Sequence, residues 1–432
     1  MGKPPSRLKQ LRRYPSLAIG LVLIAMLVGI SLYAVVAIPY PEAVRLWRAG
    51  PGVWDENPKD AQPIWWDWFT RERLSRSIIV TSQDDGIVRV EPLDDDRELF
   101  EVVLPFSYDY DAFPIELTLF TRATGREERT LISVSWETPT GDTTVLGEYH
   151  ARQSHTYYIS QDRDLRDRLG IAPHRGLFAH PHDAGRMLKG DYRLVLRAEV
   201  PRDAEVEARL VVYGQVHGPF GTDHMRRDLK VALVWGAVEG LKFGVLAALA
   251  WQVGAVIVAA KGRRRRERTD PLLWRLTDVN MVLLSLPLLI AVGYFVSPSR
   301  GVMLLALLVS SLLIALIRVL RERLVPLGRA PDTGPAPGSR TMLALLLPSF
   351  LLLIPAFVFL DAALYILNLA GDPLLPSWGN LLNHALQENA IYHGHYYEVV
   401  QPMVLLLITA LGFAMAGYAL HRIYNPGIKT KR

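Results

Sequence analysis

The sequence predicts a membrane bundle of six transmembrane helices with an extracytoplasmic all-β domain, of the sandwich or jelly-roll type, inserted between helices 1 and 2. Three observations predict it: six long apolar runs, a polar strand-like region between the first two, and basic residues concentrated in alternate connections. The chain has 432 residues, of which 50% are hydrophobic and 21% charged. These averages describe neither part, because they combine an apolar bundle with a charged insert.

Cysteine is absent from the chain, and basic residues exceed acidic ones to give a net charge of +5. Without cysteine the protein has no disulfide, thiol nucleophile or thiolate-bound metal. An exported domain must therefore be stabilised by its own hydrophobic core. Because the positive charge is unevenly distributed, its placement carries more information than its total.

Residues 1–40 are predicted to form a basic cytoplasmic tail and the first transmembrane helix. The first fourteen residues hold five basic side chains and no acid, and the apolar run Pro15–Tyr40 follows. The run has roughly the twenty residues that a bilayer crossing requires. A signal peptide is the alternative, but this run is too long for its apolar core and no small-x-small cleavage site ends it. An uncleaved helix is favoured.

Residues 41–76 form a segment rich in tryptophan and proline, which includes Trp65, Trp66 and Trp68. Aromatic side chains of this kind favour the membrane–water interface. The favoured interpretation is an interfacial collar that packs the insert onto the bilayer. The alternative is a stacking surface for sugars or peptides.

Residues 77–216 are predicted to form the β-domain. Short runs of β-type residues recur, separated by turn signals such as Asp84-Asp85-Gly86 and Lys189-Gly190-Asp191. The predicted strands are Ser77–Thr81, Leu99–Leu104, Ile115–Phe120, Thr130–Trp136, Tyr192–Val200 and Ala208–Val216. Such a series indicates an antiparallel sandwich or jelly roll. The stretch Gln161–Lys189 is less regular and is expected to cross one face of the domain.

Residues 217–432 hold the remaining helices of the bundle. The five apolar runs are Leu241–Ala260, Val279–Val296, Gly301–Ile317, Met342–Leu369 and Val399–Leu420. Basic residues cluster in 261–268, 318–340 and 422–432, whereas the loops 297–300 and 370–398 hold one arginine and no lysine. Since cytoplasmic loops are the basic ones, both termini are expected in the cytoplasm and the β-domain outside.

The chain carries no sequence motif of a nucleotide-binding or hydrolytic site. The nearest segment to a phosphate-binding loop, Gly334–Ser339, lacks the lysine and follows no strand. We therefore predict no catalytic residue, no cofactor and no metal site, and expect any energy source to lie in another subunit. Two pairs, His180 with His182 and His393 with His395, are interpreted as surface or structural histidines, with metal binding as the alternative.

A resemblance to a known family begins at the segment Phe220–Asp228. Phe220, Gly221, Thr222, Asp223, Arg227 and Asp228 resemble a motif that precedes the second membrane helix in the dipeptide/oligopeptide/nickel family of ABC-importer permeases. One departure is visible, because Arg226 stands where the family has glycine.

Further motifs follow in the order of the family. Arg275 and Asp278 resemble the entry to its third helix, and Pro348 matches the Leu-Pro that opens its fifth. The last outer loop matches at Pro376, Ser377, Trp378, Gly379 and Asn380. Matches at Pro402 and Asn425-Pro426 complete the series. The insert lies outside the resemblance.

The cytoplasmic loop before the fifth helix departs most from the family pattern. In the family a short helix there carries Glu-Ala-Ala and a glycine and couples the permease to the ATPase. The corresponding positions are Arg329, Ala330 and Pro331, followed by Gly334 beside Pro335. Each proline inside a helix costs about 3 kcal/mol. A regular coupling helix is therefore not expected. Either a shorter contact within Arg318–Arg329, which includes Arg321, replaces it, or a second permease subunit carries most of the coupling.

The resemblance implies a permease subunit of the second-permease type in a binding-protein-dependent importer for peptides. Its implied partners are a second permease subunit, two ATP-binding subunits, an extracytoplasmic solute-binding protein and the inner-membrane lipid bilayer, with no nucleic acid. The alternatives are import of oligosaccharides or nickel, or a degenerate permease serving as a membrane-anchored receptor or assembly subunit. Asp361, an acid within an apolar run, is either a structural contact or a path-lining residue. Glu239 and Lys242 are expected at the interface where the second helix begins.

Overall fold

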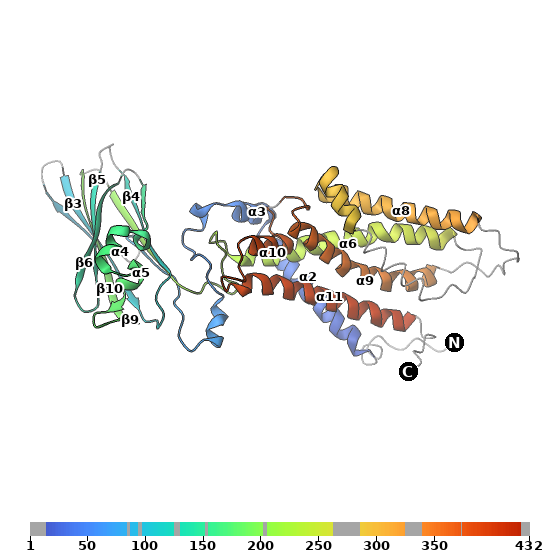
Figure 1. Ribbon diagram of the computed structural model, residues 1–432, viewed down its shortest axis with the longest axis horizontal. Coiled ribbons are helices and arrows are strands. Elements are labelled where there is room, and N and C mark those ends of the chain that lie inside the picture. The colour runs from blue at the N-terminus through green and yellow to red at the C-terminus, as the bar shows by residue number, and fades with distance from the viewer. Residues whose placement is uncertain are drawn as a thin grey trace. The chain divides into compact units, whose positions relative to one another are not determined.

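The computed structural model describes residues 14–83, 87–93, 97–124, 130–151, 154–201, 205–261, 286–324, 339–372 and 374–424. The chain divides into two compact units. One, the β-unit, comprises Ala49–Leu229, and the other, the helical unit, combines Met1–Arg48 with Lys230–Arg432. Many of the elements of the two units are labelled in Figure 1.

The β-unit contains two antiparallel sheets that share one hydrophobic core. The four-stranded sheet has the order β1 (Ile78–Thr81), β11 (Glu205–Tyr213), β4 (Glu116–Thr124) and β7 (Ser154–Tyr157). The five-stranded sheet has the order β2 (Ile87–Pro92), β3 (Arg97–Tyr108), β10 (Gly190–Pro201), β5 (Thr130–Glu137) and β6 (Thr143–Ala151). Buried residues from both sheets, such as Leu104, Leu119, Trp136 and Leu210, belong to the same cluster. The unit is thus a β-sandwich.

Strand β10 shows why these residues form a sandwich. Leu194, Leu196, Ala198 and Val200 are buried, and the charged residues between the last three are exposed. This period of two places one face of the strand in the core and the other in water. All six predicted strands overlap observed ones. Strands β2, β6 and β7 were not predicted; each lies at a sheet edge, and β2 is exposed along its whole length.

The irregular stretch between β7 and β10, which was expected to cross one face of the domain, packs against the core of the sandwich. It contains η3 (Ile159–Gln161), α4 (Arg163–Leu169), α5 (Pro173–Gly176) and the hairpin of β8 (Ala179–His180) with β9 (Asp183–Met187). Asp162 caps α4 by accepting the Leu165 N–H, and Gly170 ends the helix with a φ of 70°. Leu165 and Phe178 are buried in the core, which anchors the stretch.

The helical unit contains four helices long and apolar enough to cross a membrane among the described residues. These spans are Pro15–Ala37, Leu229–Gly254, Leu346–Ile366 and Tyr396–Tyr424, and they lie in α2 (Pro15–Ala37), α6 (Leu229–Lys261), α9 (Ser339–Ile366) and α11 (Tyr396–Tyr424). Two shorter apolar helices cover Leu286–Phe295 and Arg300–Leu316, the latter within α8 (Arg300–Leu324). Helices α3 (Tyr40–Arg48) and α10 (Trp378–Gln387) are short, and η1 (Pro51–Val53) and η2 (Ile64–Phe69) belong to the β-unit.

The second span begins at Leu229 rather than near Leu241, so the predicted start of this helix was wrong. The prediction failed because Lys230 and Glu239 interrupt the apolar pattern of the first turns. Glu239 consequently lies within the candidate span Leu229–Gly254 and is buried. Pro348, which the resemblance placed at the opening of the fifth helix, lies inside α9.

Helices α2 and α11 approach each other closely through small residues. A Cβ atom on Gly20 would lie 2.7 Å from the backbone nitrogen of Ala416, and one on Gly412 would lie 3.1 Å from the Cβ of Leu23. Close approach through glycine is typical of helices that pack within lipid. The first helix is therefore packed against α11 along one face.

Candidate functional site

The segment Phe220–Asp228 belongs to the β-unit and folds into a closed loop immediately before α6. Thr222 is buried, donates its hydroxyl to the Pro58 carbonyl at 2.7 Å and accepts the Ala61 N–H at 3.0 Å. The Leu229 N–H donates to the Gly221 carbonyl at 3.1 Å and closes the loop. Several residues of the motif therefore serve to hold the backbone in a closed loop at the start of the second span.

Asp223 and Arg227 form the buried centre of this loop. The Asp223 carboxylate accepts the backbone N–H groups of Met225 and Arg227, both at 2.9 Å, and the Arg227 Nε–H at 2.7 Å. The Arg227 side chain is 0% exposed. A buried charge of this kind is tolerated when it is paired and hydrogen-bonded.

Arg226 explains the departure from the family glycine. Its φ is 64°, in the left-handed region that favours glycine. The side chain offsets this strain, because its guanidinium pairs with Glu116, donates to the Asn57 carbonyl at 2.9 Å and lies 4.3 Å over the ring of Tyr213. Glu116 and Tyr213 lie on β4 and β11, so Arg226 fastens the motif to the sandwich.

The Pro376–Asn380 motif starts α10 within the helical unit. Ser377 caps the helix by accepting the Asn380 N–H at 3.2 Å, and the Asn380 amide donates to the Leu375 carbonyl at 2.8 Å. The Trp378 indole N–H donates to the Leu233 carbonyl of α6 at 2.8 Å. A Cβ atom on Gly379 would lie 2.6 Å from that of Tyr365 in α9. The motif therefore fixes α10 against both α6 and α9.

Gly236→Ala is expected to displace Trp378 and lower the unfolding free energy by about 1–3 kcal/mol through overpacking. The reason is that a Cβ atom on Gly236 would lie 2.2 Å from the Cδ1 of that indole. Gly29→Ala is the matched control, because nothing lies within 4 Å of its Cβ position. Thermal unfolding of the full chain in detergent measures both. Equal midpoints for the two variants would contradict the close packing.

A buried charge cluster, formed by Glu239, Arg300 and Asp361, joins three helices of the helical unit. Arg300, the first residue of α8, forms an ion pair with Glu239 of α6 and lies 3.2 Å from the Asp361 carboxylate of α9. Lys242 lies 3.9 Å from Glu239 but is largely exposed. Asp361 thus makes the structural contact that was one of the two expectations.

The charge cluster retains hydrogen-bonding capacity. Arg300 Nε, Asp361 Oδ1 and the Tyr365 hydroxyl are buried, and none of these atoms has a partner among the described residues. The Arg300 guanidinium also lies 5.1 Å over the Tyr365 ring. Ionisable groups within a membrane span usually face a bundle interior or an aqueous path. The side chains of the cluster can therefore break an ion pair with one another and form hydrogen bonds to another polar group.

The remaining predicted site residues divide between described and undescribed parts of the chain. Arg318 and Arg321 lie in α8, and Pro348 lies in α9. Arg275, Asp278, Arg329, Ala330, Pro331 and Gly334 lie outside the described residues. Sequence reasoning identified Asp361 but missed Arg300. The signal for Arg300 was its position as the one charged residue in the short connection 297–300 between two apolar runs.

The two histidine pairs lie in different units of the chain. The rings of His180 and His182 are 5.8 Å apart, at the turn of the β8–β9 hairpin. Those of His393 and His395 are 6.1 Å apart, and His395 lies 3.8 Å from Glu398.

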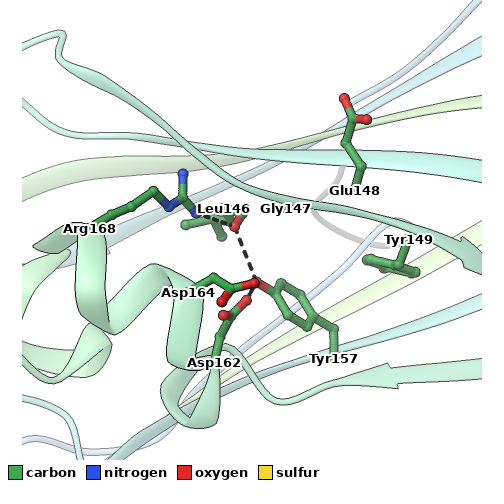
Figure 2. Close-up of a pocket in the computed structure, with 8 residues that line it drawn as sticks. All are labelled: Leu146, Gly147, Glu148, Tyr149, Tyr157, Asp162, Asp164 and Arg168. Atoms are coloured by element: carbon green, nitrogen blue, oxygen red, sulfur yellow. Dashed lines mark hydrogen bonds between the residues drawn. The ribbon is translucent and has the colours of Figure 1, made fainter.

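A cavity of about 450 Å³ lies in the β-unit beside α4 and the edge strands β6 and β7. Figure 2 shows the Tyr157 hydroxyl directed toward Asp162 and toward the Leu146 carbonyl, to which Arg168 also donates. Burial, together with the hydrogen bond to Asp162, raises the pKa of Tyr157, which keeps the hydroxyl a donor at neutral pH. Glu148 and Asp164 are exposed at the rim, so the opening is acidic and aromatic.

Comparison with known proteins finds relatives in peptide transport. The chain is 26% identical over 223 residues to the dipeptide transport system permease protein DppC of Bacillus subtilis, covering 49% of this chain and 69% of the relative. It is 28% identical over 232 residues to the di/tripeptide transport system permease protein DppC of Pseudomonas aeruginosa, covering 50% and 75%. No family profile matches the chain.

A third relative is the oligopeptide transport system permease protein OppC of Bacillus subtilis, 25% identical over 223 residues and covering 49% of this chain and 72% of the relative. About half of the chain is therefore shared with these permeases. With its apolar spans, the chain is a multi-pass membrane protein. The resemblance to the dipeptide/oligopeptide family of ABC-importer permeases, predicted from the sequence motifs, is confirmed.

Proposed function

We propose that this chain is a transmembrane permease subunit of a binding-protein-dependent ABC importer for peptides and forms half of the translocation path. The observation that carries the proposal is the similarity to permeases of dipeptide, di/tripeptide and oligopeptide transport systems over about half of the chain. The four long apolar spans support it. The chain then works with a second permease subunit, two ATP-binding subunits and an extracytoplasmic solute-binding protein, and does not hydrolyse ATP itself.

The proposed arrangement has six membrane crossings, with both termini in the cytoplasm and the β-unit outside. The two shorter apolar helices, Leu286–Phe295 and Arg300–Leu316, supply the third and fourth crossings. The alternation of connections rich in lysine and arginine with connections poor in them supports this orientation.

In this proposal the charge cluster lies beside the translocation path, and its ion pairs rearrange during transport. Alternating access requires helices of the bundle to shift relative to one another. Because Arg300 bridges Glu239 and Asp361, a shift of α8 against α6 or α9 must break at least one ion pair. Asp361 then faces the path in the state where its pair with Arg300 is open.

Reconstitution of the chain with its partner subunits in proteoliposomes tests the function. We expect peptide-loaded binding protein to stimulate ATP hydrolysis and peptide uptake together. A matched complex whose ATP-binding subunits carry a substituted catalytic carboxylate is the control and should do neither. Stimulation of ATP hydrolysis by an oligosaccharide but not by peptides would mean that the substrate is an oligosaccharide and not a peptide. Absence of stimulation by either would contradict the importer.

A degenerate permease that serves as a receptor or assembly subunit is the second candidate. Pro331, Pro335 and Pro337 favour it, since they occupy the segment where the family has its coupling helix. Replacing residues 318–340 by a family-type coupling loop separates the two. An importer is stimulated with its native loop, whereas a receptor gains stimulation only after the replacement.

A further inference from the structure

The β-unit exposes a cluster of aromatic side chains on η2. This cluster, the aromatic patch, consists of Trp65, Trp66, Trp68 and Phe69. Trp68 is 83% exposed and Phe69 is 74% exposed, and no residue of η2 is buried. The rings of Trp65, Trp66 and Phe69 lie within 6.3 Å of one another. The patch thus combines three rings in mutual contact with two strongly exposed side chains, Trp68 and Phe69.

Exposed aromatic surface of this kind marks a site of interaction with a protein, a ligand or a membrane. The sequence left an interfacial collar and a stacking surface for sugars as alternatives for residues 41–76. A sugar platform needs polar groups beside the rings. The Asp67 carboxylate, the one acid within η2, accepts the Leu74 N–H at 3.3 Å within its own loop, while the exposed Arg71 follows the patch. This arrangement favours an anionic, partly apolar surface over a sugar.

Hydrogen bonds connect the patch to the start of a membrane span. The Trp65 indole N–H donates to the Pro219 carbonyl at 2.9 Å, and the Ile64 N–H donates to the Gly218 carbonyl at 2.9 Å. Gly221, two residues after Pro219, accepts the N–H of Leu229, the first residue of the second span. The patch is therefore held to the short loop that leads directly into the bilayer.

We propose that the aromatic patch inserts into the headgroup region of the bilayer that contains the chain's own spans. Tryptophan and phenylalanine rings lie favourably at this depth, where an apolar ring meets lipid and the indole N–H meets polar groups. Arg71 faces the phosphate groups of the lipids. The patch thereby fixes the height and tilt of the β-unit above the membrane. This inference rests on the membrane location of the chain and not on transport.

The absence of cysteine makes the test direct, because a single introduced cysteine carries a unique spin label. The full chain bearing Trp68→Cys, and separately Phe69→Cys, is placed in phosphatidylcholine nanodiscs containing phosphatidylglycerol. Collision rates with oxygen, which partitions into lipid, and with a water-soluble nickel chelate are then measured. Val145→Cys is the matched control, since Val145 is 52% exposed on β6 of the same unit.

We expect labels at positions 68 and 69 to collide several-fold more with oxygen than with the chelate, relative to position 145. Equal ratios at all three positions would overturn the proposal. Protection of positions 68 and 69 from the chelate only after an oligosaccharide is added would overturn it in favour of a sugar platform. Both variants replace exposed side chains, so loss of folding is not expected. If one variant expresses poorly, the label at the other position tests the proposal.

Discussion

Arg300→Met is expected to lower the unfolding free energy of the helical unit by about 3–5 kcal/mol, the usual result of removing one partner of a buried ion pair. Its loss leaves the carboxylates of Glu239 and Asp361 buried in adjacent helices without the guanidinium between them. We also expect peptide uptake to fall at least tenfold. Thermal unfolding in detergent and uptake in proteoliposomes measure the two effects.

A charge-balanced variant separates a structural role of the charge cluster from a role in the path. Arg300→Met combined with Glu239→Gln and Asp361→Asn removes all three charges with little change in volume. Buried ion pairs are often replaceable in this way without loss of stability. We expect stability to return and uptake to remain low. Full recovery of uptake would show that the cluster is only a structural contact.

Asp223→Ala is expected to cost about 3–5 kcal/mol in the β-unit. The substitution takes the carboxylate from Arg227, whose side chain is fully buried, and removes the acceptor of two backbone N–H groups. The loop before α6 should then open. Limited proteolysis of the full chain with trypsin reports this directly, because opening exposes the peptide bonds after Arg226 and Arg227.

Glu148→Gln is the control for this experiment. Glu148 is an exposed acid of the same unit, and surface substitutions of this kind usually change stability by about 0.5 kcal/mol or less. Rapid cleavage in Asp223→Ala with protection in Glu148→Gln is the expected result. Protection in both variants would mean that the Asp223–Arg227 pair does not hold the loop closed.

Hydrophobic periodicity predicted the parts of this fold that depend on burial along one element. The alternation of buried and exposed residues in β10 was evident because one face of the strand meets the core and the other meets water. Helices α2 and α11 were evident from the length of their apolar runs. Edge strands such as β2 have no buried face and escaped detection.

The charge cluster was only partly predictable. Its members are separated by 61 positions on either side of Arg300, so their meeting depends on how three helices pack. Glu239 was interpreted as marking the start of a helix, since an acid usually lies outside an apolar span. A buried acid that is paired with a basic side chain is an exception to this rule, and the sequence does not show which basic side chain is its partner.

The closed loop before α6 brings together the two places where the chain enters and leaves the β-unit. The N–H of Asp60 donates to the carbonyl of Asp223 at 3.1 Å, and Gln62 pairs with Val216. The β-unit is therefore entered and left at nearly the same point, although more than 150 residues lie between. A module with adjoining ends fits into a short loop without forcing the flanking helices apart. By the same geometry, a linker of a few residues joining Gln62 to Val216 excises the sandwich and keeps the Phe220–Asp228 loop in the chain.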